Sequence, residues 1–203
     1  MRVLNLYAGL GGNRKLWEGC EVIAVESHEK IAEIYQRLHP NDGVIVGDAH
    51  EYLRQNFRDF DFIWSSPPCQ THSSFRFNIG VRYRGVEAKF PDMSLYEEIL
   101  FLQYHSKVLW VVENVVPYYK PFLDPTRIGR HLYWSNFELP DTPHLVDKIR
   151  GAQIPDLQNL HGYDLSKYKL PNKRQVLRNV VSPQVGLDIL EAAKNSLLRD
   201  DAE

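Results

Sequence analysis

Short apolar runs alternate with longer amphipathic segments along most of this chain. The runs are rich in β-branched residues and almost continuously apolar, which is typical of strands buried on both faces of a parallel sheet. They occupy residues 2–7, 21–26, 43–48, 61–66 and 108–114. Helical periodicity follows at residues 28–38, 49–57, 94–105 and 183–198. Alternating strands and helices predict an α/β protein with a doubly wound, mostly parallel sheet.

Composition narrows the class of protein. A chain of 203 residues with 43% hydrophobic residues suits one globular domain, and its net charge of -2 carries no overall bias toward nucleic acid. The two cysteines lie far apart and do not suggest a disulfide framework. No apolar run approaches the roughly 20 residues of a membrane-spanning helix. We therefore expect a cytoplasmic protein that does not contact a membrane.

Two regions interrupt the alternation of strands and helices. Residues 70–92 predict a long loop, and loops of that length usually act as functional lids or are disordered. This loop is basic, because its four cations, Arg76, Arg82, Arg84 and Lys89, outnumber its two acids, Glu87 and Asp92. Residues 137–173 hold four prolines and little periodicity, which places them outside the sheet.

The first strand ends in a glycine-rich turn. A dinucleotide-binding turn reads G-x-G-x-x-G, but here Arg14 stands at the third glycine position after Gly9 and Gly11. A turn that brings the backbone close to a ligand without phosphates fits better, and S-adenosylmethionine is such a ligand. A tight connection without a ligand is the alternative interpretation.

Acidic residues follow the next two strands. A carboxylate at Glu26 can accept hydrogen bonds from both hydroxyls of a ribose, and Asp48 ends the third strand within reach of an adenine amino group. Each acid alone could equally be a helix N-cap or a solvated strand end. The order of glycine turn, ribose acid and adenine acid favours a cofactor that contains adenosine.

A cysteine and a glutamate follow the fourth and fifth strands. Cys69 comes directly after Pro67 and Pro68 and is followed by polar residues, whereas Cys20 lies in an apolar stretch and is interpreted as structural. A thiol that does chemistry needs an acid or base opposite it, and Glu113 emerges from the next strand with Asn114 beside it. No metal site is expected.

These motifs resemble those of the cytosine carbon-5 DNA methyltransferases, particularly the compact phage-encoded kind. NLYAGLGG is similar to the family's first motif, VESHEK to the second, GDA to the third, PPCQTHS to the fourth and ENV to the sixth. RIGRHLYWSNF resembles the eighth in modified form, and KRQVLRNVVSP the ninth running into the tenth. The resemblance covers nearly the whole chain in the family's order, and it implies the Rossmann-like fold of S-adenosylmethionine-dependent methyltransferases.

The resemblance implies a covalent mechanism on a cytosine flipped out of duplex DNA. The Cys69 thiolate would attack carbon 6, Glu113 would hold ring nitrogen 3 and the exocyclic amine, and carbon 5 would take the methyl group. Asn114 and Arg130 would support the glutamate, the base and the catalytic loop. The residues implied to line the cofactor pocket are Tyr7, Ala8, Gly9, Gly11, Gly12, Glu26, Asp48, Pro67, Asn179 and Val181. Those implied to contact nucleic acid are Gln70, Ser73, Arg76, Arg82, Arg84, Lys173 and Arg174.

The chain departs from the family pattern where the DNA sequence is usually read. We expect a catalytic and cofactor-binding domain over residues 1–136, a reduced target-recognition insertion over 137–172, and a segment over 173–203 that completes the catalytic domain. The insertion is short, so a partner subunit or a homodimer could supply target recognition. Alternatives are the same chemistry on transfer RNA and a catalytically silent DNA-binding homologue or subunit. The setting implied is a bacterial or phage-infected cell, with a role in restriction–modification.

Overall fold

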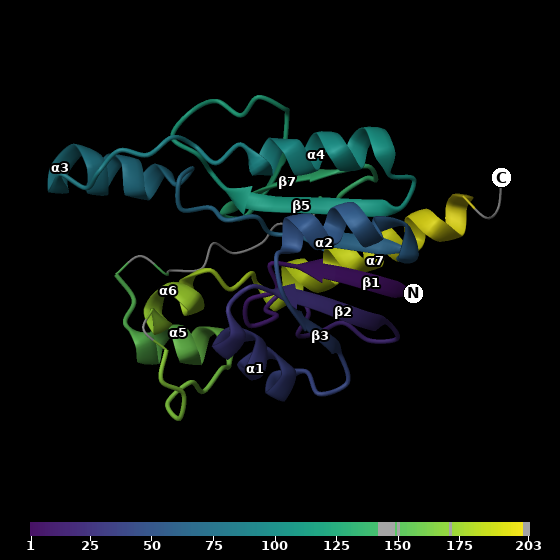
Figure 1. The fold of residues 1–203 in the computed structure, drawn as a ribbon, viewed down its shortest axis with the longest axis horizontal. Helices are drawn as coiled ribbons and strands as arrows, with labels where there is room; N and C mark the ends of the chain where they lie inside the picture. Colours follow the sequence, from purple (N-terminus) through teal and green to yellow (C-terminus); the bar gives the residue numbers. More distant parts are fainter. Residues whose placement is uncertain (142–148, 150, 171, 201–203) are drawn as a thin grey trace.

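A seven-stranded sheet forms the centre of the structure, a computed structural model that describes residues 1–141, 149, 151–170 and 172–200 (Figure 1). The strand order is β3-β2-β1-β4-β5-β7-β6. The strands span Arg2–Leu6 (β1), Glu21–Glu26 (β2), Gly43–Val46 (β3), Phe62–Ser65 (β4), Leu109–Val115 (β5), Thr126–Ile128 (β6) and His131–Ser135 (β7).

The first five strands are parallel, whereas β7 runs antiparallel to both β5 and β6. The strand order reverses between β1 and β4: the sheet continues from β1 through β2 to β3 on one side, and from β4 through β5 on the other. This reversal opens a crevice at the carboxyl ends of the strands, where doubly wound sheets bind their ligands. The predicted mostly parallel, doubly wound α/β sheet is confirmed. The β6–β7 hairpin was not predicted from the sequence.

Helices cover both faces of the sheet. On one face, α2 (Ala49–Asn56) and α4 (Ser94–His105) pack on Leu4, Leu6 and their neighbours. On the other, α7 (Pro183–Asp200) packs on Val3 and the strand residues that share its orientation. This division follows from the alternation of side chains along a strand, and it requires apolar residues at almost every strand position. The periodicity of the sequence predicted these three helices to within two residues at each end.

A third apolar cluster joins helices beside the glycine turn. It contains residues of α1 (Glu29–Leu38), α5 (Ile154–His161) and α6 (Lys173–Arg178), with Leu10 from the turn itself. The sequence indicated no helix at α5, although the side chains of Gln153 and Asp156 form a capping box there and Pro155 occupies its first turn. Part of the predicted recognition insertion, residues 142–148, 150 and 171, lies outside the described residues.

The prediction of a long loop over residues 70–92 was wrong for its central part. A π-helical segment over Arg76–Val81 continues directly into α3 (Arg82–Arg84). We call residues 76–84 the basic arm; it extends away from the sheet at the left of Figure 1. Helical backbone hydrogen bonds order this segment, and the ring of Phe77 stacks on Tyr118 with 4.4 Å between the ring centres. Nothing in the sequence indicated this helix, because its residues show no apolar periodicity. In the part of the chain that the structure describes, no helix is long and apolar enough to cross a membrane.

Candidate active site

A cavity of about 340 Å³ lies at the carboxyl edge of the sheet, beyond the ends of β1, β2, β4 and β5. Its size falls within the range of small-molecule sites. The structure brings twelve of the predicted site residues into its lining: Tyr7, Ala8, Gly9, Gly12, Glu26, Pro67, Cys69, Gln70, Glu113, Arg130, Asn179 and Val181. Residues that are far apart in the chain therefore meet at one place, because parallel strands end at the same edge.

The glycines of the first turn have different tasks. Gly9 lines the cavity with a φ of 55°, and a side chain there would meet only the Tyr7 carbonyl at 4.0 Å. Gly11 has a φ of 71°, and a side chain there would collide with His39 and Tyr35 of the α1 region. A side chain at Gly12 would collide with the backbone of Val181. Gly9 therefore leaves open space for a ligand, whereas Gly11 and Gly12 allow the turn to pack closely on its neighbours.

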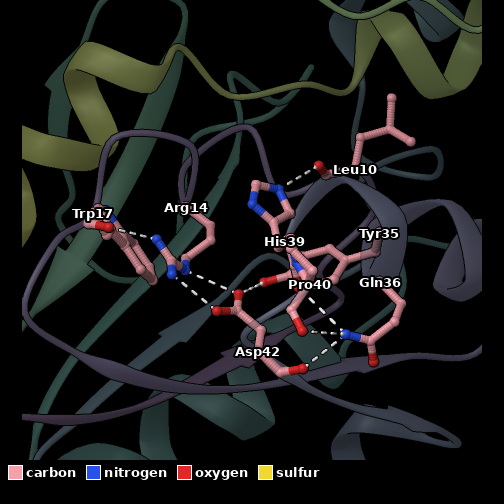
Figure 2. A network of polar contacts seen from close by, with 8 residues as sticks. All are labelled: Leu10, Arg14, Trp17, Tyr35, Gln36, His39, Pro40 and Asp42. Carbon is pink, nitrogen blue, oxygen red and sulfur yellow. Dashed lines mark hydrogen bonds and ion pairs between the residues drawn. The ribbon is translucent and has the colours of Figure 1, made fainter.

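The two cations that follow the glycine turn, Arg14 and Lys15, are not part of the cavity lining. Figure 2 shows Arg14 directed at Asp42. Both guanidinium Nε and Nη2 of Arg14 donate to the buried Asp42 carboxylate, at 2.9 Å each, and Tyr35 donates its hydroxyl to the same group. Lys15 donates to the carbonyl of His161 at 2.6 Å. Neither cation is placed to meet a phosphate at the turn, which agrees with the predicted preference for a ligand without phosphates.

Glu26, the last residue of β2, and Asp48, which follows β3, have different surroundings. Glu26 lines the cavity, and its carboxylate accepts the backbone N–H of Gly9 at 3.0 Å and of His28 at 2.8 Å. Asp48 is not part of the cavity lining; its carboxylate accepts the N–H of Glu51 at 3.0 Å and caps α2. The cap explains why an acid stands at this position. The position of Glu26 in the cavity lining supports its predicted contact with a cofactor. Asp48 has no such support, because it is not in the lining.

Cys69, in the segment after β4, and Glu113, on the neighbouring strand β5, line the same cavity. Burial, followed by the charge of Glu113, raises the pKa of the Cys69 thiol to about 11, against the opposite effect of Arg130. Burial also raises the pKa of Glu113 to about 7, although Ser66 and Arg130 favour its charged form. A neutral glutamic acid can donate a hydrogen bond, which a carboxylate cannot do. Near neutral pH, the site therefore contains a partly buried, protonated thiol and a glutamate that is ionised in only part of the molecules.

Asn114 and Arg130 hold the segments around the cavity. Asn114 Nδ2 donates to the carbonyl of Pro67 at 3.1 Å, which ties the end of β5 to the turn that carries Cys69. Arg130 Nη2 donates to the carbonyls of Val180 at 2.7 Å and Arg178 at 3.1 Å. Arg130 also lines the cavity, whereas Asn114 does not. Both residues thus connect elements that meet at the site.

Sequence reasoning did not select His131, which lines the cavity beside Glu113. Its Nε2 lies 3.5 Å from Glu113 Oε1, and both side chains are buried. Burial and Arg130 lower the pKa of His131 to about 3, so its imidazole is neutral. The antiparallel β5–β7 pairing creates this contact. The only sign of this residue in the sequence was its position directly after Arg130. Its contact with Glu113 could not be predicted, because the pairing of β7 with β5 was not predicted.

The predicted nucleic-acid contacts divide between the cavity mouth, the basic arm and α6. Gln70 lines the cavity, and Ser73 Oγ accepts the N–H of Arg76 where the basic arm begins, at 3.4 Å. Arg82 and Arg84 are exposed on that arm. On α6, Lys173 donates to the carbonyl of Leu165, and Arg174 donates to the carbonyls of Ala152 and Gly151. The two α6 cations therefore support the 151–165 segment in this structure.

Comparisons with known proteins agree with this fold and, over the first part of the chain, with the family resemblance. Residues 1–84 match the model of the C-5 cytosine-specific DNA methylases, which confirms the resemblance over that part of the chain. A search of curated proteins gives no match. The Entamoeba histolytica methyltransferase EhMeth is similar along 100% of this chain and 99% of its own, with a TM-score of 0.52 at 11% identity. The agreement over the full length confirms a methyltransferase-type, Rossmann-like fold.

Two further solved structures match with lower TM-scores. A DNMT2 variant from Spodoptera frugiperda is 23% identical over 56% of this chain, with a TM-score of 0.41, and this chain spans 35% of it. A candidate DNA modification methyltransferase encoded within a prophage (E. coli) is 17% identical over 85% of this chain and 56% of its own, with a TM-score of 0.44. The aligned part of this chain thus spans 35% of the Spodoptera protein and 56% of the prophage protein.

Proposed function

We propose that this protein methylates carbon 5 of cytosine in double-stranded DNA, with S-adenosylmethionine as the methyl donor. The observation that carries the proposal is the meeting of Cys69, Glu113 and the glycine turn in one cavity. The family match over residues 1–84 supports it, because it includes the glycine turn and Cys69. Glu113 lies outside that match, and the fold alone brings it to the thiol.

The cavity fits the proposed cofactor. Its lining combines apolar side chains, such as Tyr7, Ile31 and Val180, with the carboxylate of Glu26 at the end of β2. A carboxylate and apolar walls suit an adenosine with free ribose hydroxyls, and the open space at Gly9 allows close approach of the backbone. When bound, S-adenosylmethionine supplies a methyl group on a positively charged sulfur.

In the proposed reaction, the protein activates the cytosine by a covalent bond. Cys69 loses its proton and its sulfur bonds to carbon 6 of the ring, which makes carbon 5 electron-rich. Protonated Glu113 donates to ring nitrogen 3 and neutralises the charge that the addition creates there, and Arg130 supports the base. After carbon 5 has accepted the methyl group, its proton leaves to water, and the electron pair of that bond re-forms the double bond between carbons 5 and 6. The bond from carbon 6 to sulfur breaks at the same time, which restores the Cys69 thiolate, and ring nitrogen 3 returns its proton to Glu113.

The proposal extends to the parts that surround the cavity. The target base cannot react within a stacked duplex, so it is flipped into the cavity, and the basic arm contacts the phosphates nearby. Residues 1–136 and 173–203 together form the catalytic unit, since α7 packs on the sheet. Residues 137–172, or a partner subunit or second copy, read the target sequence.

A covalent trap tests this function. Duplex DNA with 5-fluorocytosine is incubated with the protein and S-adenosylmethionine and analysed on a denaturing gel, since fluorine blocks the final elimination. We expect a shifted band that requires the cofactor, disappears in Cys69→Ser and persists in Cys20→Ser, the matched variant of the other cysteine. Trapping on transfer RNA but not DNA would show the RNA alternative. Cofactor binding without any trap on either substrate would indicate the silent homologue.

A further inference from the structure

Glu98 is a fully buried carboxylate beside the cavity, with an exposed fraction of 0%, and the proposed reaction does not use it. It projects from α4 toward the carboxyl edge of the sheet, where three side chains donate to it. Ser65 Oγ lies 2.6 Å away, His50 Nδ1 lies 3.0 Å away, and the Tyr7 hydroxyl also hydrogen-bonds to it. Burying a carboxylate is costly unless donors surround it, so this convergence is a built feature of the fold.

Tyr7 connects Glu98 to the cofactor side of the cavity. It lines the cavity directly before the glycine turn and has a φ of 55°. A left-handed backbone at a residue other than glycine is strained and persists where its surroundings hold it. The hydrogen bond from its hydroxyl to Glu98 is such a constraint. Tyr7 therefore depends on Glu98 for a backbone conformation that shapes the glycine turn.

Ser65 connects Glu98 to the nucleophile side. It is the last residue of β4, and the segment that follows it carries Ser66, Pro67 and Cys69 into the cavity. The hydroxyl of Ser65 is buried and donates to Glu98 Oε2, while Tyr7 and His50 use Oε1. The two oxygens of one carboxylate thus hold the ends of β1 and β4, which carry the two halves of the site.

His50 connects the same carboxylate to solvent. It stands in the first turn of α2 and is partly exposed, and its hydrogen bond to Glu98 is the main reason that its pKa is raised. The charged groups that act on it are acids: Glu97 and Glu98 from α4, and Asp48 and Glu51 from the start of α2. When His50 is protonated, its positive charge therefore lies directly against the Glu98 side chain.

We propose that Glu98 is a positioning residue that aligns Tyr7 and Ser65, so that one buried carboxylate sets the geometry of both the cofactor pocket and the thiol turn. This inference rests on the proposed function, because it assigns Glu98 a task in that site. Replacing Glu98 with glutamine keeps the size of the side chain but removes its charge and one acceptor oxygen. Cofactor affinity and the rate of adduct formation then fall together.

Calorimetric binding of S-adenosylhomocysteine tests the cofactor side. We expect Glu98→Gln and Tyr7→Phe each to weaken binding about tenfold, and the double variant to weaken it by much less than the product, since both remove the same contact. Glu97→Gln is the matched control. It removes the same charge from the adjacent position, which contacts His50 at 4.0 Å but is exposed, and it should change the affinity less than about twofold.

Two further readouts separate positioning from a general loss of structure. The pKa of His50, followed by NMR of the histidine ring, should fall in Glu98→Gln and change less in Tyr7→Phe. Adduct formation with 5-fluorocytosine DNA at saturating S-adenosylmethionine should slow in Glu98→Gln and in Ser65→Ala. Tyr7→Phe leaves the buried carboxylate and most of its partners in place, so it tests the proposal even if Glu98→Gln folds poorly.

The outcomes distinguish this inference from the proposed function. If the wild-type protein does not bind S-adenosylhomocysteine and forms no adduct, the proposed function fails and the assignment to Glu98 fails with it. If the wild-type protein does both, and Glu98→Gln and Tyr7→Phe behave like Glu97→Gln, the function stands and the positioning role of Glu98 is overturned. Independent, multiplicative effects of the two substitutions would also overturn it.

Discussion

Cys69 and Glu113 have pKa values in the reverse of the order that their proposed tasks require. The thiol must lose its proton while the glutamic acid keeps its own, yet the pKa of Cys69 is about 11 and that of Glu113 is about 7. Between these values, most molecules carry a thiol and a glutamate ion. The reactive form, in which the proton has moved to the glutamate, is a minor population whose fraction does not change with pH in that interval.

The rate of adduct formation should therefore rise with pH up to about 7 and then level off through pH 9. The Glu113→Gln variant should react more slowly, and its rate should depend only on the ionisation of the Cys69 thiol. The rate should therefore increase about tenfold for each pH unit between pH 7 and pH 9. Single-turnover trapping across this pH range measures both profiles. A wild-type rate that keeps climbing steeply above pH 7 would contradict the assignment of Glu113 as the acid.

At the scale of elements, the basic arm is the segment whose conformation least resembles the sequence prediction. Its base is attached to the body by the stack of Phe77 on Tyr118, and the Arg82 guanidinium lies 5.6 Å from the centre of the Phe77 ring. Arg178 of α6, which lines the cavity, approaches the ring of Phe75 at 5.3 Å, just before the arm begins. The arm thus carries its cations outward from an aromatic base near the site.

Arg82→Ala and Arg84→Ala should each weaken DNA binding at low salt and reduce the slope of log affinity against log salt by about one, because each removes one phosphate contact. The control is Arg58→Ala, an exposed arginine in the turn of residues 57–59 that precedes the start of β4, at the opposite edge of the sheet from the cavity. Fluorescence anisotropy at several salt concentrations gives the slopes. Slopes equal to that of Arg58→Ala would exclude the arm from the DNA interface.

At the scale of the whole molecule, helix α7 supports the site from outside the cavity, although it lies far from the glycine turn in the sequence. Gly186 of α7 packs on the backbone of Asn13, a residue of the cavity lining, and its carbonyl accepts the indole N–H of Trp17 at 2.9 Å. A side chain at Gly186 would overlap the Asn13 backbone, which cannot move aside as a flexible side chain can. The glycine turn thus rests on α7.

Gly186→Ala should destabilise the protein, although helix propensity alone predicts a gain of up to about 1 kcal/mol. The overlap with Asn13 costs about 1–3 kcal/mol, and each kcal/mol lowers Tm by about 2–4 °C in a chain of this size. Binding of S-adenosylhomocysteine should weaken in parallel. Gly47→Ala is the control, because a side chain there meets only Ile45, at 4.0 Å. An unchanged or raised Tm for Gly186→Ala would refute the close packing of α7 on the turn.

Local patterns in the sequence were sufficient for the sheet and for the residues at its strand ends. Strand and helix periodicities arise from neighbouring residues, and the parallel order of strands places their carboxyl ends at one edge, so Glu26, Cys69 and Glu113 could be predicted to lie together. The helix in the basic arm and the β6–β7 hairpin could not, because each depends on hydrogen bonds that more than one conformation of those residues would allow. For Asp48, the sequence left a helix N-cap and a cofactor contact open as alternatives, and the hydrogen bond from the N–H of Glu51 shows the cap.

The contacts of Glu98, His131 and Gly186 emerged only from the folded chain. Glu98 meets Tyr7 and Ser65 across separations of 91 and 33 residues, and the carbonyl of Gly186 meets Trp17 across 169. Such contacts leave no periodic signal in the sequence. The residues next to a buried acid in a helix do not indicate whether hydrogen-bond donors from distant segments will surround it in the folded protein. Residue types and the order of the strands were enough to predict which residues carry the chemistry. The residues that hold them in place could be identified only in the tertiary structure, because packing brings together residues that are far apart in the sequence.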